Sequence, residues 1–456
     1  MHQGASLQTG SHTEYKMLYA IFPPEELVED AAVALPLSKS ISTRCLVLDA
    51  LTEGAPDNNA SIAVCDDTAV IADALAAWRA PAGTPLTLDM KASGAALRFL
   101  TAFFAATPGA DVTLTGIPRL LERPMGILVD ALRACGADIE YTGREGFAPL
   151  HIRGARLGGG EVTVDATVSS QFISALLMVA PTMRRGLTIN FEGEPVSLPY
   201  ILMTLGMMEQ RGIAAERQPL RVEVSPGAYK PYAQAAEGDW SAAAFWMEIC
   251  ALSAGWYTMT NLRADTLQGD RRAAEYFGHL GVDAVASAEH PGGIDLSPSP
   301  EVFGRLDLDL SDNPDLAPAL AVTATMIGVP FKLAGLANLG VKECDRLETL
   351  CIEMAKLGRP VEKIRDFGLE WDGRSLPVGS MPVLSAHGDH RMAMALAPVS
   401  LYIPGILLDG PEYVSKSYPE FWEQLRAVGF RLVEVEIDAE GAVKRIGGDE
   451  PPATAE

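Results

Sequence analysis

The chain has 456 residues, of which 48% are hydrophobic and 21% charged, and its formal net charge is −23. The length predicts two domains, and the composition is that of a globular protein in water. The acidic balance excludes a nucleic-acid binder, but an enzyme for small anionic substrates needs only a local cluster of cations.

The ends of the chain and its cysteines suggest a simple cytoplasmic protein. Residues 1–16 are polar and lack the apolar core of a signal peptide, so we expect a disordered leader. No apolar run is long enough to predict a membrane span. The six cysteines form no Cys-x-x-Cys pair, which predicts free thiols and no metal site. Residues 437–456 are acidic and contain Gly and Pro, which predicts a mobile tail.

Short strands alternate with helices along the chain, and most of the helices open on small or charged residues. Strands are predicted at 18–22, 86–90, 111–115, 139–141, 150–152, 161–164, 187–191, 221–224, near 257, and at 293–296, 306–310 and 331–333. Helices are predicted at 45–51, from 92, and at 125–135, 173–180, 199–211, 240–252, 271–280, 316–326, 342–357 and 420–428, with another starting within 386–394. This repeat of about 60–80 residues predicts an α/β fold. A break near 235–238 divides the chain into two similar halves.

The stretch from Leu339 to Leu347 holds a dense charge cluster. Lys342, Glu343 and Arg346 are spaced by three and four residues, which predicts that they share one face of a helix. Two cations and a carboxylate near a helix N-terminus can hold an anion and move a proton. A solvated face with internal ion pairs is the alternative.

Two earlier helix starts have a similar character. The first contains Ser38-Lys39-Ser40, and Arg44 follows Ser40 by about one helical turn. Serine hydroxyls, a lysine and free backbone N–H groups at a helix start can together bind an anion. Simple N-capping by the serines is the alternative. Gly94 opens another helix and would let a ligand approach the backbone closely.

The order and spacing of these motifs resemble one family. The motifs are Ser38-Lys39-Ser40 with Arg44, Glu122-Arg123-Pro124, Ser169-Ser170-Gln171-Phe172, Glu237-Gly238-Asp239, Pro314-Asp315, Val341-Lys342-Glu343 with Asp345-Arg346-Leu347, Asp389-His390-Arg391-Met392-Ala393-Met394, and Lys416-Ser417-Tyr418-Pro419. From about Leu35 to Leu425 the chain resembles 5-enolpyruvylshikimate-3-phosphate synthase, also called 3-phosphoshikimate 1-carboxyvinyltransferase.

The resemblance implies two similar domains, each of three repeated βαβαββ units around a pseudo-threefold axis, with the active site in the cleft between them. The implied domains are 34–236, which would bind shikimate-3-phosphate, and 17–33 plus 237–436. The implied reaction transfers enolpyruvyl from phosphoenolpyruvate to the 5-hydroxyl of shikimate-3-phosphate and releases phosphate, through a tetrahedral intermediate. This step leads to chorismate and the aromatic amino acids. A monomer without cofactor or metal is expected.

The family match also implies site residues. Shikimate-3-phosphate would contact Lys39, Ser40, Arg44, Ser169, Ser170, Gln171, Ser197, Tyr200, Asp315, Asn338 and Lys342. Phosphoenolpyruvate would contact Lys39, Gly94, Arg123, Gln171, Arg346, Arg391 and Lys416. Asp315 would be the base near the 5-hydroxyl, and Glu343 with Lys342 the proton-transfer pair at the other carbon. Neighbouring cations lower the pKa of a carboxylate and burial raises it, so the sequence alone leaves open whether the pKa of Glu343 is lowered or raised.

The chain departs from the family pattern at several positions near the implied phosphoenolpyruvate pocket. These are Leu37, Ala92, Ala95, Phe99, Leu339 and Gly340. The family is the target of glyphosate, which binds beside the glycine matched by Gly94, so an inhibition curve is needed to measure the effect of the altered neighbours.

Two alternatives stay open. UDP-N-acetylglucosamine enolpyruvyl transferase shares the fold and the donor but carries a reactive cysteine in a mobile loop, whereas Cys135 here ends a predicted helix. A relative without activity, acting as a binding protein, is the other.

Two further residues are expected to have structural roles. His390 is expected to brace a helix start, and Trp240 to pack against other side chains.

Overall fold

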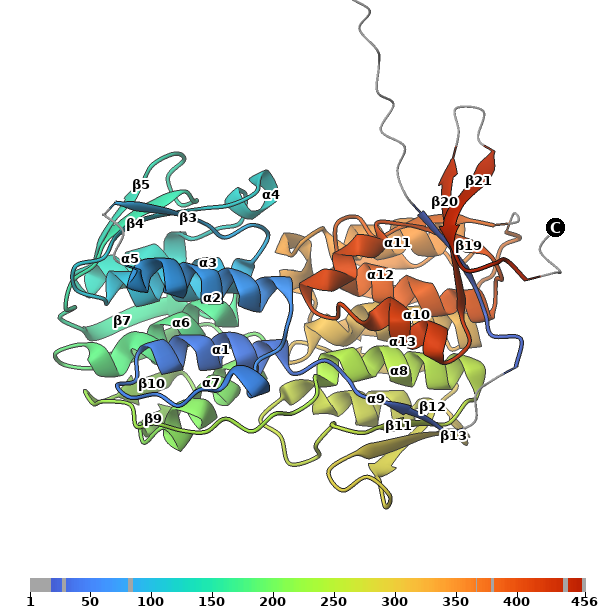
Figure 1. The fold of residues 1–456 in the computed structure, drawn as a ribbon, viewed down its shortest axis with the longest axis horizontal. Coiled ribbons are helices and arrows are strands. Elements are labelled where there is room, and N and C mark those ends of the chain that lie inside the picture. The colour runs from blue at the N-terminus through green and yellow to red at the C-terminus, as the bar shows by residue number, and fades with distance from the viewer. Residues whose placement is uncertain are drawn as a thin grey trace, which may run out of the picture.

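The computed structural model describes residues 18–26, 30–80, 85–365, 367–378, 381–437 and 442–452; the predicted leader lies outside them. The chain forms two lobes (Figure 1). The core of the N-terminal lobe is built from residues between Ile41 and Tyr229. The main core of the C-terminal lobe is built from residues between Ile21 and Leu35 and between Trp240 and Leu432.

Two adjacent chain segments join the lobes. Leu37 and Gly238 form an antiparallel bridge. The backbone N–H of Ser38 donates to the carbonyl of Glu237 at 2.9 Å, and that of Asp239 donates to Pro36 at 2.9 Å. The two crossings therefore support each other through backbone hydrogen bonds.

The described part of the N-terminal lobe contains two four-stranded sheets with the same topology, β3-β4-β6-β5 and β7-β8-β10-β9. Its strands are β3 (Leu86–Asp89), β4 (Asp111–Thr115), β5 (Asp138–Tyr141), β6 (Leu150–Arg153), β7 (Gly160–Asp165), β8 (Leu187–Glu192), β9 (Ala215–Gln218) and β10 (Arg221–Val224). Its helices are α1 (Lys39–Ala50), α2 (Asp66–Arg79), α3 (Gly94–Ala105), α4 (Pro118–Leu121), α5 (Gly126–Ala134), α6 (Ser170–Val179) and α7 (Leu198–Gln210). In each sheet the first two strands are parallel and the other pairings antiparallel, which is a βαβαββ unit. Helices α1 and α2 pack on each other and on α3.

Three sheets make up the described part of the C-terminal lobe, β12-β13-β11-β2, β14-β15-β17-β16 and β18-β19-β1-β20-β21. Its strands are β1 (Leu18–Phe22), β2 (Ala31–Val33), β11 (Tyr257–Met259), β12 (Leu280–Ala286), β13 (Ile294–Val302), β14 (Leu306–Asp309), β15 (Phe331–Ala334), β16 (Glu362–Ile364), β17 (Gly368–Trp371), β18 (Val383–Ser385), β19 (Ile406–Asp409), β20 (Arg431–Ile437) and β21 (Val443–Gly448). Its helices are α8 (Trp240–Ser253), α9 (Ala273–Gly278), α10 (Ala317–Ile327), α11 (Arg346–Lys356), α12 (His390–Leu396) and α13 (Phe421–Ala427). Strands β1 and β2 come from the start of the chain, so this lobe is discontinuous in sequence.

Several elements differ from the prediction, and the sequence did not predict β2, β9, α4 or the strands from β16 to β20. Helix α2 was not predicted, and β12 begins at Leu280, where a helix was expected to end. The mobile tail predicted for 437–456 is wrong for Val443–Gly448, because this segment forms β21 and pairs antiparallel with β20. The free edge of β20 offers backbone partners that compensate for the polar composition of the tail.

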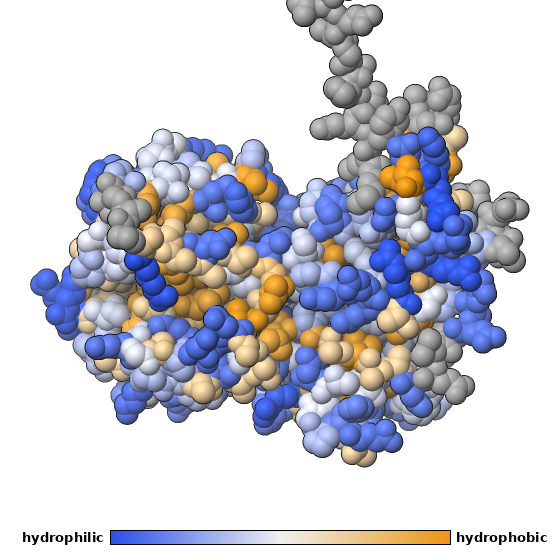
Figure 2. Space-filling view, viewed as in Figure 1, coloured by the Kyte–Doolittle hydropathy of each residue, from blue (hydrophilic) through white to orange (hydrophobic). Residues whose placement is uncertain are grey.

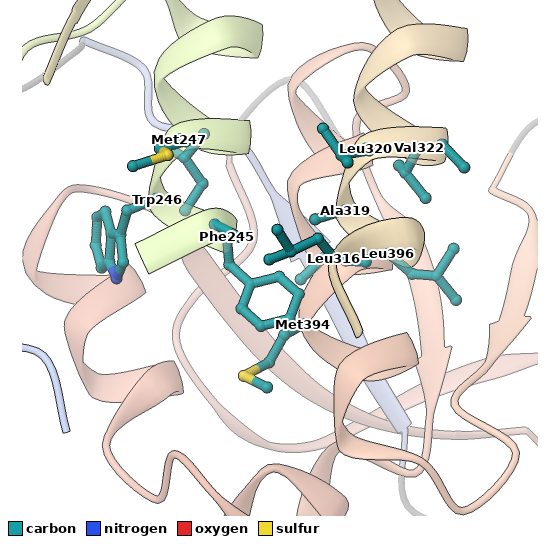
Figure 3. Packing of buried hydrophobic residues seen from close by; sticks show 14 of the residues in the cluster. Phe245, Trp246, Met247, Leu316, Ala319, Leu320, Val322, Met394 and Leu396 are labelled. Atoms are coloured by element: carbon teal, nitrogen blue, oxygen red, sulfur yellow. The ribbon is translucent and has the colours of Figure 1, made fainter. Parts of the chain in front are cut away.

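Helices α8, α10 and α12 pack side by side in the core of the C-terminal lobe (Figure 3). Helix α10 is buried all round, from Ala317 to Met326, as its uninterrupted run of small and apolar residues requires. Within the described residues, no helix combines the length and apolarity needed to span a membrane.

Glu248 is an unusual member of this core. Its side chain lies on α8 with 0% exposure, and neither carboxylate oxygen has a hydrogen-bond partner among the described residues. Burial raises the pKa of Glu248 well above its ordinary value of 4.5. The folded state therefore holds a proton that the unfolded chain releases, so stability falls as the pH rises from 4.5 toward the raised pKa.

Replacing Glu248 with methionine is expected to raise the free energy of unfolding by about 1–3 kcal/mol at neutral pH, because it removes an unpaired buried polar group of similar length. Glu248→Gln keeps the polar group but cannot ionise. Denaturant unfolding between about pH 5 and pH 8 measures both effects. The stability advantage of Glu248→Gln over the wild type should grow with pH, whereas exposed Glu275→Gln should show no such trend. An advantage that stays constant would contradict the assignment.

Candidate active site

Core helices of both lobes begin at one cavity between the lobes. In the described residues this cavity encloses about 840 Å³, part of it open to solvent. It is lined by Lys39, Ser40, Thr43, Arg44, Asp67, Gly94, Ala95, Phe99, Arg123, Ser169, Ser170, Gln171, Ser197, Tyr200, Asp315, Asn338, Lys342, Glu343, Arg346, His390 and Arg391. Many of these residues open α1, α3, α6 or α12, so free N–H groups and the positive ends of helix dipoles lie close to the cavity.

Polar residues cap several helices at this junction. The side chain of Ser93 accepts from Ala96 N–H, and that of Ser169 accepts from Gln171 N–H. Asp389 caps α12 in the same way. Ser38 precedes α1 but makes no side-chain cap, so the simple capping explanation for that motif does not apply to Ser38.

All of the predicted site residues except Lys416 line the cavity. The ammonium of Lys416 lies at its wall, 3.2 Å from Oε1 of Glu343, and donates to the carbonyl of Ala92 at 2.8 Å. The structure thus brings the predicted residues together from both halves of the chain.

Asp315 is the carboxylate at the centre of the C-terminal wall. Its oxygens lie 2.8 Å from Arg346, 3.2 Å from Arg391 and 3.3 Å from Lys342. Burial tends to raise the pKa of Asp315, but the charges of these three cations outweigh it and hold the pKa well below 3.8. Asp315 is therefore ionised at neutral pH.

Glu343 occupies the side of the cavity that faces the N-terminal lobe. Its carboxylate lies 3.2 Å from Lys416 and 3.0 Å from Arg346. Burial acts to raise the pKa of Glu343, yet Lys416, Arg346 and Arg123 together lower it well below 4.5. The pKa of Lys342 is lowered from 10.5, chiefly by burial, which makes its ammonium a better proton donor than an exposed lysine.

The local conformation of this cluster differs from the prediction. Residues 342–344 form bends, and α11 begins only at Arg346, so the expectation that Lys342, Glu343 and Arg346 share a helix face is wrong. The side chain of Asp345 accepts from Glu348 N–H at 3.1 Å and so caps α11 at this point. The three side chains converge through the loop, not through helical spacing.

Arg44 is held on the N-terminal side of the cavity. It donates to Thr204 at 2.7 Å, to Ser174 at 3.2 Å and to the carbonyl of Ser40 at 2.8 Å. Burial lowers the pKa of Arg44 to about 10, so the guanidinium remains charged at neutral pH.

Ser197 lies in the left-handed region, with φ at +55°. Its N–H donates to the carbonyl of Ser311 and its Oγ accepts from Asn338, both of the C-terminal lobe. These contacts tie the two sides of the cavity together at Ser197.

Gly94 allows two arginines to pass close to the backbone. A Cβ at this position would collide with Nη1 of Arg123 and lie 2.5 Å from Nη1 of Arg98. Arg123 is half-buried, and its buried Nε has no hydrogen-bond partner among the described residues. Oε1 of Gln171 and Oδ1 of Asn338 are also buried and have no hydrogen-bond partner among the described residues. Such groups are suited to hold a polar ligand.

The positions that depart from the family pattern have identifiable surroundings. Phe99 lines the cavity with its ring 5.3 Å from the guanidinium of Arg44, and Ala95 lines it as well. Ala92 has no polar side chain, but its backbone carbonyl accepts a hydrogen bond from Lys416. Leu37 belongs to the bridge between the lobes and Leu339 is fully buried. A Cβ at Gly340 would meet no atom within 4 Å.

Asp67, Thr43 and His390 line the cavity although none was predicted to bind a ligand. Asp67 lies 3.2 Å from Lys39 and 3.9 Å from Lys416, and so joins cations of both lobes. The pair Asp66-Asp67 at the start of an apolar-periodic stretch is the helix-start signal that could have revealed it. Burial and the charge of Lys39 lower the pKa of His390 well below 6.5, so its ring is neutral.

The cavity is positive within an acidic protein. Its walls carry the cations Lys39, Arg44, Arg123, Lys342, Arg346 and Arg391 and the carboxylates Asp67, Asp315 and Glu343. This excess of buried cations can bind anionic groups, and the arginines offer paired donors to phosphate or carboxylate. The carboxylates among them can accept protons.

The comparisons with known proteins agree with each other. The sequence pattern of the family described as EPSP synthase (3-phosphoshikimate 1-carboxyvinyltransferase) matches residues 28–425. The chain is 43% identical to a 3-phosphoshikimate 1-carboxyvinyltransferase of Bacteroides fragilis, across 91% of this chain and 99% of the relative. It is 34% identical to a protein of the same name from Methanoculleus marisnigri, across 88% of this chain and 97% of the relative. A solved EPSP synthase from Acinetobacter baumannii has a TM-score of 0.71 at 20% identity, covering 91% of this chain and 99% of that one. This likeness confirms the predicted α/β fold of two similar domains.

Proposed function

The chain belongs to the EPSP synthase family, and on that premise we propose that it transfers the enolpyruvyl group of phosphoenolpyruvate to the 5-hydroxyl of shikimate-3-phosphate. The products are 5-enolpyruvylshikimate-3-phosphate and phosphate, on the route to chorismate and the aromatic amino acids. The observation that carries the proposal is the convergence of cations from both lobes on one cavity that also holds Asp315 and Glu343.

Shikimate-3-phosphate fits the N-terminal side of the cavity. Its phosphate would be held by Ser169, Ser170, Ser197 and Lys39, because α6 begins at the serine pair and offers free N–H groups. Its carboxylate would meet Arg44 and Ser40, while Gln171 and Tyr200 line the ring. Asn338, Asp315 and Lys342 would reach it from the C-terminal side.

Phosphoenolpyruvate fits the space between the lobes. We infer that Arg123, Arg346, Arg391 and Lys416 clamp its phosphate and carboxylate, with Lys39 shared, Gln171 alongside and the Gly94 backbone close by. Arg391, Lys416 and Arg346 pair with Asp315, Glu343 and Asp389 respectively, so an incoming anion would share these cations with the carboxylates.

The proposed chemistry has two steps. In the first, Asp315 accepts the proton of the 5-hydroxyl, the oxygen adds to C2 of phosphoenolpyruvate, and the methylene carbon C3 gains a proton. In the second, C3 loses a proton, the bond between C2 and the phosphate oxygen breaks and phosphate leaves, which restores the C2–C3 double bond and forms the enol ether of the product. Asp315 starts ionised because the neighbouring cations outweigh its burial, so it is free to accept a proton. Substrate anions that bind to the same cations would raise the pKa of Asp315 and make it a stronger base.

Glu343 and Lys342 would exchange the proton at C3. Glu343 starts ionised because Lys416, Arg346 and Arg123 offset its burial. An anion bound to these cations would weaken that offset and raise the pKa of Glu343, so the carboxyl could gain and lose a proton during the cycle. Lys342, with its lowered pKa, is the nearby donor.

The alternative acceptor is less well supported. Cys135 is buried at the end of α5 and is not among the cavity residues, so it does not match the loop cysteine of UDP-N-acetylglucosamine enolpyruvyl transferases. A relative without activity would not need Asp315, Lys342 and Glu343 grouped at one cavity.

A phosphate-release assay tests the proposal. Phosphate should appear with phosphoenolpyruvate and shikimate-3-phosphate together and not with either alone. Release with UDP-N-acetylglucosamine as acceptor would favour the rival enzyme. Tight binding of both compounds without release would favour a binding protein.

Gly94→Ala is expected to raise KM for phosphoenolpyruvate on the order of 10-fold or more, because the new Cβ displaces Arg123 from its place beside the backbone. KM for shikimate-3-phosphate should change much less. Gly278→Ala, whose Cβ would meet no atom within 4 Å, is the matched control. Steady-state kinetics with each substrate varied gives both constants, and an unchanged KM for phosphoenolpyruvate would show that Gly94 does not matter for the clamp.

The organisation of the molecule completes the proposal. We infer domains at 34–236 and at 17–33 plus 237–436, which is supported by the separate cores of the two lobes. We also infer that the protein is a cytoplasmic monomer. It would work without metal or cofactor, because side-chain cations in the cavity are already available to neutralise both phosphates.

A further inference from the structure

Arg119 links the two lobes at the loop that carries the proposed proton-transfer residues. It lies on the short helix α4 of the N-terminal lobe, which Figure 1 shows at the edge facing the C-terminal lobe. Its Nε donates to the backbone carbonyl of Glu343 at 3.2 Å, and its Nη2 donates to that of Lys342 at 3.2 Å. The space-filling view in Figure 2 shows the surface notched between the lobes.

The remaining guanidinium nitrogen keeps Arg119 in place. Nη1 lies 3.3 Å from Oε2 of Glu122, three residues further along the chain. Arg123 follows one turn after Arg119 and lines the cavity. One short segment therefore supplies a proposed phosphoenolpyruvate ligand and a contact to the backbone of the opposite lobe.

The backbone that Arg119 contacts has limited support from regular structure. Lys342 and Glu343 lie between the 3-10 helix Ala337–Val341 and α11, in a series of bends. A planar guanidinium can donate to two neighbouring carbonyls at once, which fixes the orientation of the loop as well as its distance. A lysine ammonium lacks this fork geometry.

On the basis of the proposed function, we propose that Arg119 is a positioning residue. When the lobes are together, its fork holds the carbonyls of Lys342 and Glu343 and aligns their side chains with the reacting carbon. Lobe contact and the alignment of the proton-transfer pair are thereby coupled. Arg119 is not among the residues that line the cavity, so it would act through the loop.

Kinetics of three variants test the coupling. Arg119→Ala should lower kcat on the order of 10-fold to 100-fold, with little change in KM for shikimate-3-phosphate, because misplacement of the loop affects the chemical step. Arg119→Lys should recover little, since the charge alone does not restore both hydrogen bonds. Glu122→Gln keeps the fork and should stay close to the wild type.

Arg272→Ala is a matched control. Arg119 and Arg272 have side-chain exposures of 42% and 44%, and each pairs with a glutamate three residues later at 3.3 Å. Unlike Arg119, Arg272 makes its hydrogen bonds and ring contact with Glu275 and Tyr276 of its own segment, so its loss should leave kcat unchanged. An unchanged kcat in Arg119→Ala, or full rescue by lysine, would overturn the proposal.

Hydrogen–deuterium exchange separates this proposal from the proposed function. Amides of residues 339–347 should exchange faster in Arg119→Ala than in the wild type or Arg272→Ala, whether or not the enzyme turns over. Equal exchange would overturn the positioning role. Absence of phosphate release by the wild type would instead overturn the proposed function, while the exchange result still decides the role of Arg119.

Discussion

Asp315→Asn is expected to lower kcat on the order of 10²–10⁴-fold, because it removes the group that accepts the proton of the 5-hydroxyl. The amide cannot accept that proton, although it keeps the size of the side chain. The substitution also frees Arg346, Arg391 and Lys342 from their shared carboxylate. KM for phosphoenolpyruvate should therefore stay the same or fall, since an anion no longer competes with Asp315 for these cations.

Steady-state kinetics measures this split between kcat and KM. Asp312→Asn is a suitable control, because Asp312 precedes the same helical segment and does not line the cavity. A kcat within about 2-fold of the wild type would exclude general-base catalysis by Asp315. A large rise in KM with unchanged kcat would assign Asp315 to binding alone.

Glu343→Gln is expected to lower kcat on the order of 10²–10³-fold, because the amide cannot carry the proton to and from C3. The carboxylate now pairs with Lys416 and Arg346, so its loss leaves these cations to the substrate and should not weaken phosphoenolpyruvate binding. Phosphate release under saturating substrates gives the effect on kcat.

Glu348→Gln provides the control for this second substitution. Glu348 lies on α11 only five residues away and pairs with Lys363 on the surface. It should leave turnover unchanged. Undiminished turnover in Glu343→Gln would refute the proton-transfer role and leave Lys342 as the remaining candidate.

Much of the site was predictable because its residues stand at helix starts. Ser169, Gly94 and Arg391 lie where a polar or small segment meets an apolar helix, and this junction is visible in the sequence. The family resemblance then brought these separate junctions to one cavity. Asp67 was missed because α2 was not recognised, although the helix has acidic residues in its first turn.

Other properties required the fold. The spacing of Lys342, Glu343 and Arg346 fits a helix, yet Asp345 caps α11 and leaves the first two in a loop. Whether burial or neighbouring charge dominates the pKa of Glu343 depends on distances between residues far apart in the sequence. The contact of Arg119 with the opposite lobe spans more than 220 positions, which no local pattern reveals.

Cations of both lobes are expected to hold two acidic metabolites face to face in one cavity. A crystal structure of the slow Glu343→Gln variant with shikimate-3-phosphate and phosphoenolpyruvate tests this expectation most directly. We expect one phosphate on Ser169 and Ser170, the other among Arg123, Arg346, Arg391 and Lys416, and the 5-hydroxyl about 3–3.5 Å from C2 of phosphoenolpyruvate. Either compound bound outside this cavity, or the two bound at separate sites, would show that the cations do not form a shared substrate site.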